Sequence, residues 1–181
     1  NKIKFFLISI FVIFFNYHVC AENNLINPEP YTSESSKNFK SLKTEDFIVA
    51  TANDYATKIG YEILNKGGNV YDAAVAIQMT LGLVEPQSSG LGGGTFITTF
   101  NNKLKKFLSY NGRETAPIKI PENVFLEKNN MPKKFFSAAI GGLSVGVPGT
   151  IKAFYQLHKD FGILEWSEIL KPVIKLAKNG S

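Results

Sequence analysis

Apolar and polar residues alternate in the first half of the chain in a way that predicts a short strand followed by a helix. A run of apolar residues at 47–50 indicates the strand. Beyond it, small or apolar side chains recur at helical spacing at Ala56, Ile59, Gly60, Ile63 and Leu64. Either Thr51 or Asn53 can cap the start of this helix, and Gly67 with Gly68 can end it.

A second helix is predicted over residues 70–84. Asp72 falls in its first turn, where the positive end of the helix dipole favours a carboxylate. Small alanine side chains on this helix allow a neighbouring element to approach closely. Pro86 follows the apolar pattern and is expected to stop the helix there.

The period of the pattern then changes from helical to two. Residues 96–100 alternate in the manner of a strand with one buried face, and residues 104–110 repeat the pattern. Asn101 with Asn102 can turn the chain between them, and Asn111-Gly112 ends the second run. The sequence therefore predicts an antiparallel hairpin.

The rest of the chain predicts an irregular segment and two helices. Residues 113–135 contain three prolines and show no periodicity. Residues 142–149 indicate a short strand that runs into a helix with Pro148 in its first turn. Residues 166–178 form a further helical pattern, which Pro172 is expected to kink or split.

The N-terminus has the layout of a secretory signal peptide at residues 1–21. Two early lysines precede an apolar run over residues 5–15, and Val19 and Ala21 occupy the −3 and −1 positions of a cleavage site after Ala21. The apolar run is shorter than the roughly 18–20 residues that span a bilayer. An uncleaved anchor is the alternative. The pattern predicts export to a periplasm or to the medium.

Composition divides the remaining chain into a polar linker and one globular domain. Residues 22–46 are rich in polar side chains and predict a flexible linker, whereas residues 47–181 carry the periodic patterns. Aromatic residues make up 13% of the chain, which is too many for a disordered protein. The formal net charge of +5 falls to +3 when Lys2 and Lys4 leave with the leader, and this mild charge gives no reason to expect a nucleic-acid partner.

Histidine and cysteine are too scarce for the commonest metal sites. Cleavage of the leader removes Cys20, and lipidation of this cysteine is the alternative. Cleavage also leaves His158 as the one histidine of the given sequence. The mature chain can therefore build neither a multi-histidine nor a zinc–cysteine site. His158 could act as a general base oriented by Asp160 or Glu114, but a lone histidine on a helix is more often structural.

A glycine cluster and a single arginine are the clearest candidates for ligand binding. The glycines at 90, 92, 93 and 94 follow a helix and precede a strand, which is the reverse of a dinucleotide-binding loop. Their backbone can instead pack closely or turn free N–H groups toward a ligand. Arg113 follows the hairpin at a strand end, where its guanidinium could bind a carboxylate through two parallel hydrogen bonds; a surface salt bridge is the alternative.

Several ordered motifs together resemble the gamma-glutamyltransferase (glutathione hydrolase) family. The resemblance runs from about Phe47 to the last residue. The matching segments are ILNKGGN (63–69), DAAVA (72–76), VEP (84–86), SGLGGG (89–94), GRETAP (112–117), GVPG (146–149), LHK (157–159) and LA (176–177).

This resemblance implies an α+β fold, the αββα sandwich of an N-terminal nucleophile hydrolase, of which only the N-terminal portion is present. Such precursors cleave themselves into a large and a small subunit, and the new N-terminal threonine of the small subunit attacks the gamma-glutamyl amide. The family needs no metal or organic cofactor. Its arginine of the R-E-x-A-P motif, Arg113 here, holds the α-carboxylate of the substrate glutamate.

The resemblance also implies partners and a missing half. Family members are several-fold longer, and no segment here matches the threonine-rich processing site, so no catalytic residue is assigned and the fragment alone is expected to be inactive. The expected partners are glutathione or another gamma-glutamyl compound, an acceptor amino acid or peptide, and the small subunit from the same precursor. Two rivals are an acylase of the same fold, acting on a β-lactam side chain or polyglutamate, and an exported glutamate-binding module without turnover.

Overall fold

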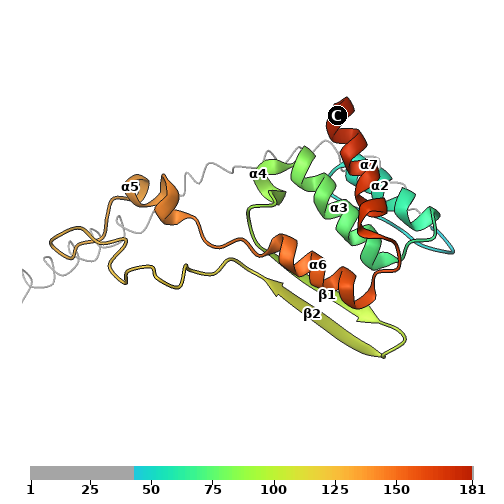
Figure 1. Cartoon of the computed structure of the whole chain (residues 1–181), viewed down its shortest axis with the longest axis horizontal. Coiled ribbons are helices and arrows are strands. Elements are labelled where there is room, and N and C mark those ends of the chain that lie inside the picture. The colour runs from blue at the N-terminus through green and yellow to red at the C-terminus, as the bar shows by residue number, and fades with distance from the viewer. Residues whose placement is uncertain (1–42, 181) are drawn as a thin grey trace, which may run out of the picture. The chain divides into compact units, whose positions relative to one another are not determined.

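The structure is a computed structural model that describes residues 43–180 (Figure 1). The predicted leader, and all but the last few residues of the predicted linker, lie outside the described residues. Within residues 43–180 no helix has the length and apolar character needed to cross a membrane. The elements in chain order are α2 (Asp54–Asn65), α3 (Val70–Val84), α4 (Pro86–Ser89), β1 (Thr95–Asn101), β2 (Lys106–Gly112), α5 (Phe135–Ala139), the 3₁₀ turn η2 (Gly142–Ser144), α6 (Thr150–Phe161) and α7 (Trp166–Asn179).

Helix α2 forms where the periodic pattern predicted it. Of the two candidate caps it is Asn53 whose side chain accepts a hydrogen bond from the backbone of Tyr55, at 3.0 Å. The helix ends before Gly67, which adopts the left-handed φ of +90°. Gly60 faces α3, and a Cβ at that position would lie 2.6 Å from Ile77, so glycine is what lets the two helices approach.

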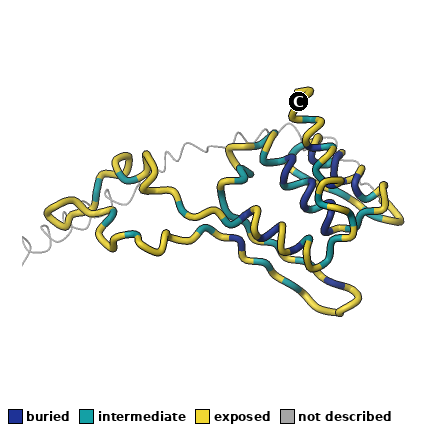
Figure 2. Tube along the Cα trace, viewed as in Figure 1, coloured by how far each residue is buried: buried dark blue, intermediate teal, exposed yellow. Residues whose placement is uncertain are grey.

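The core lies where α3 packs against α2, α6 and α7 (Figure 2). Helix α3 is apolar on most of its surface, as expected of a helix with neighbours on several sides. Its predicted bounds are confirmed. The buried apolar residues of the core include Ile59, Ile63, Val75, Ala76, Phe154, Leu157, Ile169 and Val173.

Asp72 ties the start of α3 to the loop between α6 and α7. Its side chain is fully buried and completes a capping box with Asn69, whose backbone N–H donates to it at 3.0 Å. The backbone N–H groups of Ile163 and Leu164 also donate to this carboxylate, at 3.2 and 3.4 Å. One side chain therefore satisfies N–H groups from two segments that are far apart in sequence.

Strands β1 and β2 form the predicted antiparallel hairpin, and α6 packs on it. Ile97 pairs with Tyr110 on the face that packs toward the core, while Phe100 and Phe107 pair on the exposed face with their ring centroids 5.0 Å apart. Strand β2 begins at Lys106, two residues later than the predicted start, because the turn is longer than an Asn-Asn pair and continues to Lys105.

Residues 113–148 form an extended arm that leads away from the hairpin and returns to α6 (Figure 1). The arm is mostly irregular, as predicted, but the strand predicted within residues 142–149 is wrong. The chain forms η2 there, and Val147 makes only an isolated bridge with Thr115. Pro148 lies before α6 rather than in its first turn, because Gly149 is the residue that precedes the helix as its N-cap.

Two further expectations about elements fail because of tertiary packing. Residues 47–50 form no strand, since Phe47 and Val49 pack against α2 instead and no strand lies beside them in the described part of the chain. Helix α7 runs without a break through Pro172. Ile169 and Val173, on either side of the proline, are both buried in the core, and this packing keeps the helix continuous despite the lost backbone hydrogen bond, so the predicted split is wrong.

Candidate functional site

Arg113 stands immediately after β2, where the hairpin gives way to the arm. Its backbone N–H donates to Oδ1 of Asn111 at 3.0 Å, which fixes the turn out of the strand. The side chain remains 57% exposed, and the guanidinium carbon lies 6.0 Å from the ring centroid of Phe96. The strand and its turn thus fix the backbone of this cation, while its side chain stays accessible to a ligand.

Glu114, which the sequence offered only as a partner for His158, is the acid beside Arg113. Its Oε2 lies 3.0 Å from Nη1 of the arginine. This oxygen is buried and accepts no hydrogen bond of good geometry from the described residues. Its ion pair with Arg113 therefore compensates for its burial, and the pair fixes the carboxylate at the base of the guanidinium.

The glycine cluster makes room for this acid. A Cβ at Gly94 would collide with the carboxylate of Glu114, and one at Gly146 would lie 2.9 Å from its Cβ. The carbonyl of Gly93 accepts hydrogen bonds from the backbone and hydroxyl of Thr150 at 3.3 and 3.0 Å, which pins the loop to the start of α6. The loop lies between α4 and β1. The sequence predicted a helix before the glycines and a strand after them, but not the short helix α4 itself.

Arg113 and the glycine loop share a polar cavity of about 550 Å³. A second cavity of about 310 Å³ lies on the other side of Arg113, against β2 and α6. Arg113 lines both spaces, and its exposed guanidinium can bind a small molecule with a carboxylate. The first cavity is lined, besides the glycines, by Gln78, Pro86, Gln87, Ser88, Ser89, Thr95, Arg113 and Glu114.

His158 does not join this site. Its Nε2 lies 2.9 Å from the carbonyl oxygen of Leu164 and 3.7 Å from Oδ1 of Asp72, and its ring packs edge-on against Trp166. The two acids proposed as its orienting partners are engaged elsewhere, Glu114 with Arg113 and Asp160 with Tyr110. The hypothesis that they orient His158 is therefore wrong, and this histidine belongs to the junction around Asp72.

The phenol of Tyr110 lines the second cavity and donates a hydrogen bond to Asp160 at 2.8 Å. Burial and this bond, with the negative charge of Asp160, raise the pKa of Tyr110 to about 12 from its ordinary 10.0. Because the neutral phenol is favoured in the folded state, its contribution to stability is present below pH 10 and is lost as the pH rises toward 12.

This shift can be measured by absorbance titration of the tyrosines in the alkaline range. We expect the difference between the wild-type and Tyr110→Phe titrations to have its midpoint near pH 12. The control is Asp160→Asn, which removes the carboxylate and should lower that midpoint toward 10. A difference curve centred near 10 in the wild-type background would contradict the hydrogen bond.

Comparison with known proteins gives consistent matches. The family model described as Gamma-glutamyltranspeptidase matches residues 56–181. The glutathione hydrolase proenzyme of Bacillus subtilis is 37% identical over 83% of this chain and 27% of its own length. The chain thus spans about a quarter of that relative.

Two solved structures resemble the chain as well. The gamma-glutamyltranspeptidase of Pseudomonas nitroreducens, complexed with L-DON, is 36% identical with a TM-score of 0.69, over 74% of this chain and 39% of that one. The gamma-glutamyltranspeptidase of Helicobacter pylori is 33% identical with a TM-score of 0.73, over 78% of this chain and 40% of that one. These matches agree with the family resemblance and with the mixed α and β fold expected from the motifs.

Proposed function

The chain belongs to the gamma-glutamyltranspeptidase family, and on this premise we propose that the complete protein cleaves the gamma-glutamyl amide of glutathione and related compounds. The chain supplies a portion of the N-terminal nucleophile hydrolase fold. The proposal assigns the nucleophile to a threonine that residues 1–181 do not contain. Autocatalytic cleavage of the precursor would expose that threonine at the start of the small subunit.

The proposed reaction has two steps. The threonine hydroxyl attacks the gamma-carbonyl, its proton passes to the threonine α-amine, and the amine protonates the leaving amide nitrogen as the C–N bond breaks. A glutamyl ester remains on the threonine. Water or an acceptor amine then attacks this ester, and its proton passes through the α-amine to the threonine oxygen as the ester C–O bond breaks. The glutamyl group leaves as glutamate or as a new gamma-glutamyl amide, and the threonine hydroxyl is restored. None of these steps needs a metal or cofactor.

Arg113 is the residue of this chain to which we assign a direct contact with substrate. The observation that carries the assignment is an arginine whose backbone is fixed at a strand end, whose side chain is half-exposed, and which lines a polar cavity. Two parallel hydrogen bonds to the glutamate α-carboxylate would fix one end of the substrate. The gamma-amide at the other end would then lie at a set distance for attack.

The arm supports the proposal that a further polypeptide covers this chain. Large apolar side chains are exposed along it, a pattern typical of a surface that packs against a partner. We assign that role to the rest of the same precursor, including the small subunit, and the chain alone would be inactive. The exposed residues include Ile118, Met131, Phe135, Phe136, Ile140 and Val145.

Export is the second part of the proposal. The basic, apolar and small-residue regions of residues 1–21 support a leader cleaved after Ala21. Secretion or a periplasmic location follows from that leader. N-terminal sequencing of the protein from its host should begin at Glu22, and a protein that retains residues 1–21 would contradict cleavage.

A substrate panel tests the proposed activity in the complete protein. We expect hydrolysis of gamma-glutamyl anilide and slower hydrolysis of glutaryl anilide. The glutaryl group keeps the carboxylate that Arg113 would bind but lacks the α-amine of glutamate, so polar groups of a glutamate site would be left without a partner. The measurement is the release of the aniline. Faster cleavage of the glutaryl compound would favour the acylase, and glutamate binding without cleavage of either would favour a non-catalytic module.

A further inference from the structure

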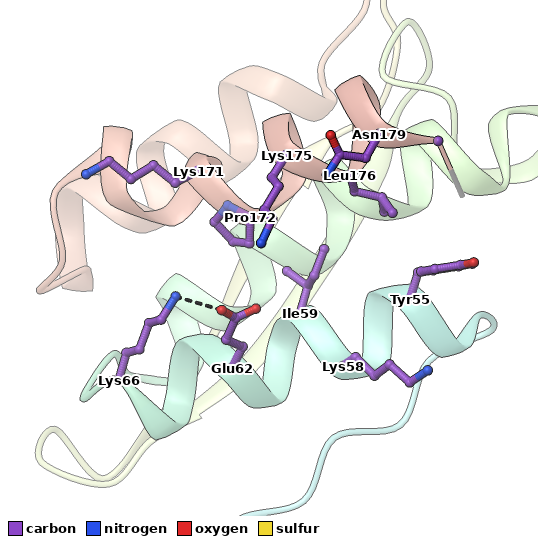
Figure 3. A pocket seen from close by; sticks show the side chains of 11 residues that line it. Tyr55, Lys58, Ile59, Glu62, Lys66, Lys171, Pro172, Lys175, Leu176 and Asn179 are labelled. Atoms are coloured by element: carbon purple, nitrogen blue, oxygen red, sulfur yellow. Dashed lines mark hydrogen bonds and ion pairs between the residues drawn. The ribbon is translucent and has the colours of Figure 1, made fainter.

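A basic groove lies between α2 and α7, apart from the two cavities beside Arg113 (Figure 3). Its volume is about 470 Å³, and its walls are the facing sides of the two helices. Pro172 and Lys175 reach from α7 toward α2, and Ile59 reaches from α2 into the space between them. The groove shares no lining residue with either cavity beside Arg113. We name it the lysine groove.

The charges in the lysine groove are unbalanced. Four lysines line it, against one acid, Glu62. Glu62 already forms an ion pair with Lys66 at 2.8 Å. Lys171 contacts Glu168, which lies outside the groove lining.

This pairing leaves two cations for an incoming anion. Neither Lys58 nor Lys175 forms an ion pair within residues 43–180. They come from different helices, Lys58 from α2 and Lys175 from α7, so an anion between them would contact both walls. Lys58 also lies over the ring of Tyr55, with its Nζ 5.9 Å from the centroid, which keeps this cation at the edge of the groove.

Apolar side chains between the lysines make the groove unsuited to a bare anion. Ile59 is almost fully buried, Pro172 and Leu176 are half-buried, and Tyr55 is exposed. An apolar centre with a charged rim is the usual anatomy of a polypeptide-binding surface. Lysine, as a flexible point charge, also tolerates carboxylates at varied spacing better than the rigid fork of arginine does.

We propose that the lysine groove binds an acidic polypeptide segment of a partner protein. The carboxylates of that segment would pair with Lys58 and Lys175, and an apolar side chain would lie over Pro172 and Leu176. This proposal rests on charge complementarity and on the apolar floor. It does not depend on the activity proposed for the family, so either can fail alone.

Fluorescence anisotropy of the full chain tests the proposal with a labelled peptide of glutamates interrupted by two leucines. We expect the peptide to bind at low ionic strength and to be released as salt is raised. The variant that removes both unpaired cations, Lys58→Gln with Lys175→Gln, should weaken binding about tenfold. The matched control, Lys119→Gln with Lys128→Gln, removes two exposed charges from the arm and should leave binding within about twofold.

Two further probes separate the proposal from its alternatives. Replacing the two leucines of the peptide with serine should weaken binding if the apolar floor takes part. Vesicles that contain phosphatidylserine should bind no more weakly to the double variant than to the wild type. Three results would overturn the proposal. They are equal weakening of binding by the arm control, unweakened binding of the serine peptide, and vesicle binding that depends on Lys58 and Lys175. Circular dichroism of each variant establishes that the fold is retained.

Discussion

Replacing Arg113 with alanine in the complete protein should raise KM for glutathione by about 30-fold or more and leave kcat near its original value. Loss of one partner from a hydrogen-bonded charge pair costs about 2–5 kcal/mol, and each 1.4 kcal/mol is about a tenfold change. The α-carboxylate keeps its charge throughout the reaction, so the arginine would bind substrate and transition state about equally. Such a loss appears in KM. Steady-state kinetics with glutathione measures both constants.

Three controls isolate the carboxylate contact. Arg113→Lys keeps the charge without the two-pronged geometry, so its KM should fall between those of the wild type and the alanine variant. Lys152→Ala removes the other cation that lines the cavity against β2, and we expect its KM to be unchanged. A gamma-glutamyl substrate with an amidated α-carboxylate should be cleaved equally by wild type and Arg113→Ala. An unaltered KM for glutathione in Arg113→Ala would remove this residue from the substrate site.

The helices and the hairpin could be predicted from the sequence because each has local signals that agree with its packing. Helix α3 has Asn69 and Asp72 at its start and Pro86 just beyond its end, and its predicted bounds were met. The hairpin follows from a strict period of two, which places Ile97 and Tyr110 on one face. Where local chemistry and burial point to the same element, the sequence is sufficient.

The failed predictions involve contacts that are distant in sequence. The run at 47–50 has the composition of a strand. Its neighbour is helix α2, so it packs through its side chains and forms no backbone hydrogen-bond ladder with another strand in the described residues. Proline normally ends a helix, but α7 continues through Pro172 because neighbouring residues of the helix are buried in the core. Neither outcome is visible in a local pattern, because both depend on which surface the segment meets.

The candidate site was predicted in part. The position of Arg113 at a strand end was evident from the hairpin and the following prolines, and its role with substrate stays a prediction. The sequence did not reveal that Glu114 is held beside it in a space cleared by Gly94 and Gly146. Charged neighbours in sequence usually point apart in a strand, so only the turn after β2 brings this pair together.

Replacing Asp72 with alanine should lower the free energy of unfolding by about 3–5 kcal/mol, which is a large part of the roughly 5–15 kcal/mol of a typical domain. The substitution would leave the N–H groups of Asn69, Ile163 and Leu164 without the buried carboxylate that accepts from them. Urea unfolding of the full chain measures the loss. The one tryptophan, Trp166, packs against His158 beside Asp72, so its fluorescence reports on this junction.

The size of the loss should follow the number of acceptors that remain. Asp72→Asn keeps one carbonyl oxygen for these N–H groups and should cost about half as much as the alanine variant. Asp54→Asn changes an exposed acid in the first turn of α2 and should cost less than about 0.5 kcal/mol. Equal stability of Asp72→Ala and the wild type would contradict the junction, because the segment after α6 would then be held to α3 by packing alone.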